Sequence, residues 1–177
     1  MANPNKPGTK DFLYLDDLHV GQRFVSGTHL IDEEQIKAFA KQFDPQPFHL
    51  DAEAAKDTLF EGLVASGWHT AAISMRLLVE SGLPIAGGIV GVGGEIAWPK
   101  PTRPDATLHV ESEILEMRPS RSRPDRGVAT IRSETRNQVG EIVQVLIAKL
   151  VVSRRTSAAA SAEENVTRRV DGGAAQI

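Results

Sequence analysis

The second half of this 177-residue sequence contains four successive segments with the pattern of β-strands, and one long apolar helical segment precedes them. The first, GIVGVGGEIAW, combines β-branched residues with glycines that indicate a bulge or a close backbone approach. ATLHVESEILEM alternates, with Leu108, Val110 and Ile114 on one face, and NQVG between GVATIRSETRN and EIVQVLIAKLVV suits a tight hairpin turn. This order predicts an α+β fold, in which an antiparallel sheet with a meander of these strands wraps around the long helix.

The elements before the long helix are also marked in the sequence. Residues 23–31 are rich in β-forming side chains and predict a strand. Asp32 can cap the helix that follows, and this helix should end near Phe43, because Pro45 disfavours helical geometry for the residue before it. Asp51 can cap a second, short helix.

The long helix is expected at residues 67–81, with Ser66 as its N-cap. Gly82 and Pro84 are typical of a helix end. Apolar and small residues recur at helical spacing and predict the face that packs on the sheet, namely Trp68, Ala71, Ala72, Met75, Leu78 and Val79.

Length and composition indicate one domain and exclude several classes of protein. The packed domain is expected at residues 12–152, between a flexible arm at 1–11 and a disordered tail at 153–177. A net charge of −3 gives no basic field for nucleic acid, and no apolar run is long enough to span a membrane. No signal peptide is recognised, so a cytoplasmic protein is expected. The absence of cysteine excludes disulfides, cysteine-ligated zinc and cysteine nucleophiles, and the histidines lack metal-site spacing, so no metal is expected.

Asp44 and His49 are the first candidates for catalysis. Asp44 follows a helix C-terminus, where the macrodipole disfavours a negative charge by ~0.3–1 kcal/mol, so a structural role explains it poorly. Pro45 and Pro47 are expected to keep the link to His49 extended and stiff, which would hold the acid and the imidazole at a set separation. His49 can give or take a proton near neutral pH, and such a pair could share one water molecule.

The pair Ser66-Gly67 is the second candidate feature. Ser66 as a simple N-cap is a sufficient structural explanation. The amide groups of a helix N-terminus are also free to donate hydrogen bonds, and Gly67 has no side chain to keep a ligand oxygen away. Together with Asp44 and His49, an amide donor of this kind is typical of a site that stabilises a developing enolate.

The stretch FDPQPFHLDAEAA resembles the hydratase motif of the MaoC-like dehydratases, the (R)-specific enoyl-CoA hydratases. That motif is commonly Asp-x-Asn-Pro-(Ile/Leu)-His followed by a small residue, and Asp44, Pro47 and His49 match it. LVASGWHTAAISMRLL resembles the central helix of the family, and AWPKPTRPDATLHVESEILEMRPSRSRPDRG resembles the later strands. The resemblance covers most of residues 12–152.

The resemblance implies a single hot-dog fold, with about five strands around a long central helix, in a homodimer or a dimer of dimers. It implies a hydro-lyase that reversibly adds water to a trans-2-enoyl-CoA, or a related unsaturated acyl-CoA, to give a 3-hydroxyacyl-CoA. Asp44 and His49 would hold the catalytic water, and the amide of Gly67 would bind the thioester oxygen. CoA is part of the substrate, so no other cofactor is implied.

This sequence departs from the family pattern at positions expected to bind substrate. Gln46 stands where asparagine is usual, and Ser66 replaces the histidine that usually precedes the glycine. Phe48 and Trp68 are bulkier than the usual residues and would narrow the acyl pocket. These changes leave Asp44 and its histidine partner in place.

Two other functions stay open, a hot-dog acyl-CoA thioesterase and a non-catalytic acyl-CoA-binding subunit. Thioesterases of this fold usually carry a carboxylate on the central helix, whereas the first acid here is Glu80, at its far end. The intact acid–histidine pair argues against a subunit without catalysis. Two groups of basic residues are compatible both with CoA phosphates and with plain exposure to solvent, namely Arg118, Arg121, Arg123 and Arg126 in one loop and Lys100 and Arg103 in another.

Overall fold

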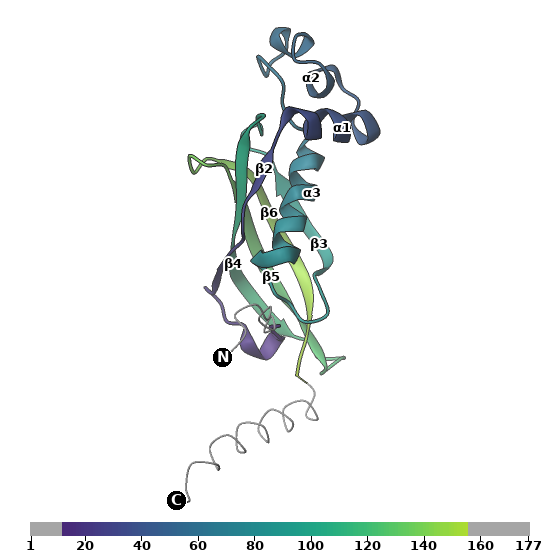
Figure 1. Ribbon diagram of the computed structural model, residues 1–177. Helices are drawn as coiled ribbons and strands as arrows, with labels where there is room; N and C mark the ends of the chain where they lie inside the picture. The colour runs from purple at the N-terminus through teal and green to yellow at the C-terminus, as the bar shows by residue number, and fades with distance from the viewer. Residues whose placement is uncertain (1–11, 156–177) are drawn as a thin grey trace, which may run out of the picture.

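An antiparallel sheet wraps around one central helix in the computed structural model, which describes residues 12–155 (Figure 1). Five of the six strands follow the order β1-β4-β5-β6-β3, and the sixth, β2, pairs with β4 beyond the end of β1. This confirms the predicted α+β class and the sheet around a long helix. The strands are β1 (Arg23–Val25), β2 (His29–Ile31), β3 (Val90–Ala97), β4 (Ala106–Pro119), β5 (Arg126–Arg136) and β6 (Ile142–Ser153).

The predicted meander is wrong in one respect, because β3 does not lie beside β4. It pairs with β6 at the opposite edge, while β1 and β2 occupy the free edge of β4. The predicted single strand at residues 23–31 is divided at Ser26, whose backbone and side chain both bond to Val110 of β4. The expected irregularity in β3 is confirmed, since the register shifts between Gly91 and Gly93.

The central helix α3 (Gly67–Leu77) begins at its predicted N-cap Ser66 and continues as a π-helical turn, η3 (Leu78–Gly82). The predicted packing face is largely wrong. Trp68, Met75 and Val79 have exposed fractions of 62%, 42% and 57%, and only Leu78 of that stripe belongs to the core. The buried face instead contains His69, Thr70, Ile73, Ser74 and Leu77.

Hydroxyl pairs explain why polar residues of α3 face the sheet. Ser74 bonds to Thr135 of β5 at 2.6 Å, and Thr70 donates to Thr102 at 2.9 Å. Because each buried hydroxyl has a partner, its burial carries little penalty. A pattern that counts serine and threonine as polar therefore assigns the wrong face.

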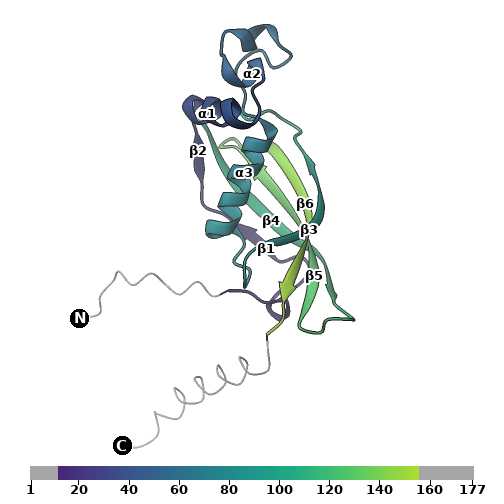
Figure 2. The ribbon, with the colours of Figure 1, turned by 90° about the vertical axis from the view of Figure 1, so that its right-hand side faces the viewer.

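Short helices form a layer over one end of the sheet, near the start of α3 (Figures 1 and 2). The helix α1 (Glu33–Phe43) ends where predicted, and its cap Asp32 accepts a hydrogen bond from the backbone of Gln35. After it come α2 (Pro47–Leu50) and the 3₁₀ turn η2 (Ala54–Asp57). A further 3₁₀ turn, η1 (Leu15–Asp17), precedes β1.

The two prolines predicted an extended link between Asp44 and His49, but only part of this link is extended. Gln46 is extended, but Pro47 is the first residue of α2, and His49 lies within that helical turn. Proline fits the first helical position, because its missing N–H needs no partner there. Asp51 accepts hydrogen bonds from the backbone of Glu53 and Ala54, as its predicted capping role requires.

Residues beyond the predicted domain end belong to the folded body. The strand β6 runs through Ser153, Arg154 pairs with Asp16 at 2.7 Å, and Arg155 pairs with Asp17 at 3.0 Å. The expected tail therefore begins at least three residues too early; the rest of it, 156–177, and the expected arm at 1–11 lie outside the described residues. No helix in residues 12–155 is long and apolar enough to cross a membrane.

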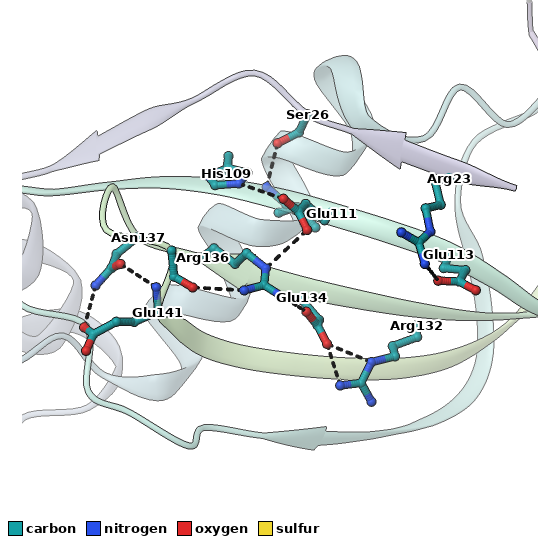
Figure 3. A network of polar contacts seen from close by, with 12 residues as sticks. Arg23, Ser26, His109, Glu111, Glu113, Arg132, Glu134, Arg136, Asn137 and Glu141 are labelled. Carbon is teal, nitrogen blue, oxygen red and sulfur yellow. Dashed lines mark hydrogen bonds and ion pairs between the residues drawn. The ribbon is translucent and has the colours of Figure 1, made fainter. Parts of the chain in front are cut away.

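Charged side chains cover the face of the sheet that points away from α3 (Figure 3). Arg23 of β1 pairs with Glu113 of β4 at 3.0 Å, and Arg136 of β5 contacts Glu111 at 3.2 Å and also Glu134. Exposed ion pairs of this kind contribute ~0–1 kcal/mol each. The core therefore lies on the inner side of the sheet, against α3.

Candidate active site

Asp44 lies where α1 ends and faces the beginning of α3. Its backbone N–H donates to Ala40, and its conformation is no longer helical, as expected of a residue before proline. One carboxylate oxygen, Oδ2, accepts a hydrogen bond from Ser66 Oγ at 2.7 Å, and Oδ1 accepts one from Gln46 Nε2 at 2.8 Å. These contacts hold the carboxylate in a defined orientation.

The structure brings His49 to Asp44. The imidazole is 5% exposed, and its Nδ1 lies 2.7 Å from the carbonyl oxygen of Val64. Because a carbonyl can only accept, Nδ1 carries a proton and donates it. The other ring nitrogen, Nε2, lies 3.4 Å from Asp44 Oδ2 and presents its lone pair when the ring is neutral.

Asp44 is ionised at neutral pH. Burial raises the pKa of its carboxyl group, but the hydrogen bonds from Ser66 and Gln46, with attraction to the His49 ring whenever that ring is protonated, lower the pKa below the ordinary value. Two groups that can each accept a proton therefore face one another inside the protein.

The N-terminus of α3 forms the next part of the site. Ser66 donates its proton to Asp44 and accepts a hydrogen bond from the backbone N–H of Trp68 at 3.2 Å. For the amide of Gly67, no acceptor lies among residues 12–155. This amide is thus available to an oxygen of a bound molecule.

The presence of glycine at position 67 has a structural explanation as well as the predicted functional one. A Cβ at this position would lie 2.8 Å from Cε2 and 2.9 Å from Cδ2 of Trp98, so the close approach is made by the indole ring. That ring is fixed in turn, because Trp98 Nε1 donates to Gln144 Oε1 at 3.0 Å. Only glycine fits between α3 and Trp98 in this arrangement.

A hollow of about 580 Å³ joins these groups. All six residues predicted for the site line it: Asp44, Phe48, His49, Ser66, Gly67 and Trp68. Its aromatic wall is built from two pairs, Phe48 with Phe60 at 5.0 Å between ring centroids and Trp68 with Trp98 at 5.3 Å. Of the described residues that line the hollow, Asp44 is the sole carboxylate, and no group of three potential metal ligands occurs in residues 12–155.

The structure separates the two groups of basic residues. Lys100 and Arg103 line the hollow. The loop with Arg118, Arg121, Arg123 and Arg126 connects β4 to β5 at the other end of the sheet, away from α2 (Figure 1). Two lining groups were not predicted from the sequence, the carbonyl of Val64 and the indole of Trp98, and neither was Gln144, which holds Trp98 from behind. Trp98 and Gln144 are distant in the chain, and only folding brings them to this site.

His69 lies two residues after Gly67 but does not line the hollow. It is 8% exposed and stacks on Phe39 of α1 with 4.5 Å between ring centroids. Its Nδ1 is buried without a hydrogen-bond partner among the described residues. Burial, with a smaller effect of the charge of His29, lowers its pKa from 6.5 to about 4.

We expect His69 to make folding stability depend on pH. The folded state keeps this ring neutral down to about pH 4, whereas the unfolded chain protonates it below about pH 6.5. The contribution is fully present above pH 6.5 and falls by about 3 kcal/mol as the pH drops through this window. Denaturant unfolding at pH 7, 5.5 and 4.5 should show His69→Phe losing less stability than the wild type. The exposed His19, changed to Gln, is the control, and equal slopes for wild type and His69→Phe would contradict the assignment.

Comparisons with known proteins agree with this fold. A family model described as "MaoC like domain" matches residues 18–137. The uncharacterized protein YdeM of Bacillus subtilis (strain 168) is 35% identical over 125 residues, which are 70% of this chain and 87% of that protein. The crystal structure of the MaoC-like dehydratase from Rhodospirillum rubrum is 61% identical with a TM-score of 0.80, covering 81% of this chain and 99% of that one. The R-hydratase PhaJ1 from Pseudomonas aeruginosa is 28% identical with a TM-score of 0.63, covering 80% and 86%.

Proposed function

Because the chain belongs to the family of MaoC-like domains, we propose that it is a hydro-lyase for unsaturated acyl-CoA thioesters. It reversibly adds water to a trans-2-enoyl-CoA, or a related compound, to give a 3-hydroxyacyl-CoA. The observation that carries this proposal is the 3.4 Å approach of Asp44 Oδ2 to His49 Nε2 at the wall of the hollow. No cofactor besides the CoA of the substrate is part of the proposal.

The pair suits the activation of water. Asp44 is ionised, and neutral His49 with its proton on Nδ1 offers a lone pair on Nε2. A water molecule that donates one proton to each of these acceptors turns its own lone pairs toward the hollow. It is therefore oriented as a nucleophile, and general acid–base help of this kind contributes ~10²–10⁴-fold.

The thioester is oriented by the start of α3. Its carbonyl oxygen accepts the free N–H of Gly67, which polarises the conjugated double bond and stabilises the enolate as it forms. A single donor of this kind contributes ~3–4 kcal/mol to the transition state. Binding at this amide sets the thioester carbonyl at the N-terminus of α3 and the β-carbon toward Asp44.

The steps balance without another reactant. The water oxygen bonds to the β-carbon, one water proton passes to the Asp44–His49 pair, and the electrons of the double bond move to the enolate. A proton from the pair then reaches the α-carbon, and the carbonyl re-forms. The pair ends in its starting protonation state, and the reverse sequence dehydrates a 3-hydroxyacyl-CoA.

The alternative activities predict different chemistry. A thioesterase would attack the carbonyl carbon and release a free thiol. Thioesterases of this fold usually have a carboxylate on the central helix, and α3 has none. The first acid after the start of α3 is Glu80, which lies in η3 and pairs with Arg76 at 2.8 Å. A binding subunit would hold acyl-CoA without turnover.

The test is to follow crotonyl-CoA at the absorbance of its conjugated enone, with a thiol reagent and tryptophan fluorescence in parallel. Loss of the enone signal without thiol release supports the hydro-lyase. Thiol release indicates the thioesterase. Fluorescence quenching by the substrate with no change in either signal indicates a binding subunit.

We further propose that the protein is a homodimer, formed through the outer face of α3 and the edge strand β3. Every residue of β3 except Ile96 is exposed, and Trp68, Met75 and Val79 form an exposed apolar stripe on α3 and η3. Unpaired strand edges and apolar stripes of this size usually mark an interface. Sedimentation should give a dimer for the wild type and mostly monomer for Met75→Glu. A wild-type monomer at micromolar concentration would contradict the proposal.

A further inference from the structure

We propose that Lys100 and Arg103 bind the phosphate groups of CoA at the mouth of the hollow, an inference that rests on the proposed function. The two residues come from the segment that connects β3 to β4, and both line the hollow. They would hold the nucleotide end of the substrate, while the thioester lies at Gly67.

The backbone that carries these cations is fixed. The carbonyl of Thr102 accepts a hydrogen bond from Ala65 at 2.9 Å, and the Thr102 hydroxyl, 3% exposed, accepts one from Thr70 of α3. The backbone N–H of Asp105 donates to Ile31 of β2 at 2.8 Å. The segment is thus tied both to the residue before Ser66 and to the helix that begins with Gly67.

Arg103 is available for an anion. Its Nη2 donates to the carbonyl oxygen of Phe60 at 2.5 Å, and its Nη1 lies near Gly62. No carboxylate of the described residues forms an ion pair with it, and the side chain is exposed to solvent. The remaining N–H groups of the guanidinium can therefore donate to phosphate oxygens, which match their planar geometry.

Lys100 can exchange its partner. Its ammonium lies 2.5 Å from Glu141 of the β5–β6 connection, but the two side chains are 54% and 44% exposed. An ion pair this accessible contributes no more than ~1 kcal/mol, so a doubly charged phosphate competes for the lysine at little cost. Glu141 keeps a second partner, because Asn137 Nδ2 donates to its other oxygen at 2.9 Å.

The charged residues that line the hollow come from two different parts of the chain. Asp44, the sole acid among the described lining residues, is bonded to Ser66 at the start of α3, whereas both cations stand on the segment that follows β3. The protein as a whole carries a net charge of −3, so this positive mouth is a local feature. An anionic nucleotide is attracted to these two cations.

The chain supplies its own reporter for binding. It contains two tryptophans, Trp68 and Trp98, and both line the hollow, so their fluorescence reports occupancy without turnover. CoA and pantetheine are the probes, because pantetheine has the same thiol arm but no phosphate. The variant is Lys100→Gln/Arg103→Gln, which removes both positive charges and keeps a polar side chain at each position.

We expect the double variant to bind CoA about ten-fold or more weakly and pantetheine within about two-fold of the wild type. The wild-type affinity for CoA should fall with salt, and that of the variant should be nearly independent of it. Glu141→Gln, which releases Lys100, should tighten CoA binding. The matched control is Arg121→Ala/Arg123→Ala in the β4–β5 loop, which should bind CoA as the wild type does.

The outcomes distinguish a failure of the phosphate site from a failure of the proposed hydro-lyase activity. Equal CoA binding by the wild type and the double variant would overturn the phosphate site. Weaker CoA binding by the β4–β5 control variant would also overturn it, and so would a wild type that does not bind CoA. Loss of CoA binding in the double variant supports the site even if crotonyl-CoA is not hydrated, and in that case the hydro-lyase proposal alone fails.

Discussion

Asp44→Asn should lower kcat/KM for crotonyl-CoA hydration by about 10³-fold, within the ~10²–10⁴-fold range of general acid–base catalysis. Asparagine keeps the size of the side chain and can still bond to Ser66 and Gln46, so the loss should reflect the missing proton acceptor. The measurement is the initial rate at the enone absorbance. Tryptophan quenching by CoA and the thermal midpoint serve as controls and should change little.

His49→Gln should produce a loss of similar size, because both residues hold the same water molecule. Glutamine keeps a polar side chain of similar length but cannot exchange protons near neutral pH. The double variant Asp44→Asn/His49→Gln should be little slower than either single variant, since groups that act as a unit are not additive. Either single variant with activity within about three-fold of the wild type would refute the assigned pair.

Gly67→Pro should lower kcat by about 10²–10³-fold relative to Gly67→Ala. Both substitutions add a Cβ against Trp98, but only proline removes the N–H proposed to bind the thioester oxygen. Proline is tolerated at the first position of a helix, and Ser66, with ψ of 141°, already has the extended conformation required of the residue before it. The ratio of the two rates therefore isolates the amide donor from the packing.

The packing effect has its own measurement. Gly67→Ala should lower the free energy of unfolding by ~1–3 kcal/mol, because the indole ring is held by Gln144 and cannot simply move away. In a Trp98→Leu background the added Cβ has room, so alanine should be tolerated while proline remains slow. Equal kcat for the proline and alanine variants would show that the Gly67 amide does not take part.

Features set by neighbours in the chain could be predicted from the sequence. The end of α1 at Phe43, the caps Asp32 and Ser66, and the hairpin turn before β6 depend on side chains within a few residues. The pairing of Asp44 with His49 was predicted from the two prolines between them, although the link is partly helical rather than extended. The resemblance then supported the catalytic roles of both residues and of Gly67.

Features that depend on distant partners could not be predicted. The buried face of α3 contains Ser74 because its hydroxyl forms a hydrogen bond with that of Thr135 in β5, 61 residues away in the chain. Similarly, β3 lies at the edge next to β6 because β1 and β2 fill the other edge of the sheet. The helical turn at Pro47 was missed because the prediction treated proline as a residue that prevents a helix. Proline disrupts the interior of a helix, but it fits the first turn.

The groups proposed to carry out the chemistry all lie between Asp44 and Gly67, whereas Trp98, Lys100 and Arg103 belong to the later segment that closes over them. The reacting groups and the proposed phosphate ligands are thus encoded in separate stretches of one chain. Substitutions in the later stretch can change which thioester enters while the water-activating pair keeps its contacts. Relatives that share the earlier stretch but lack the two cations should therefore perform the same addition on thioesters whose carrier has a different charge.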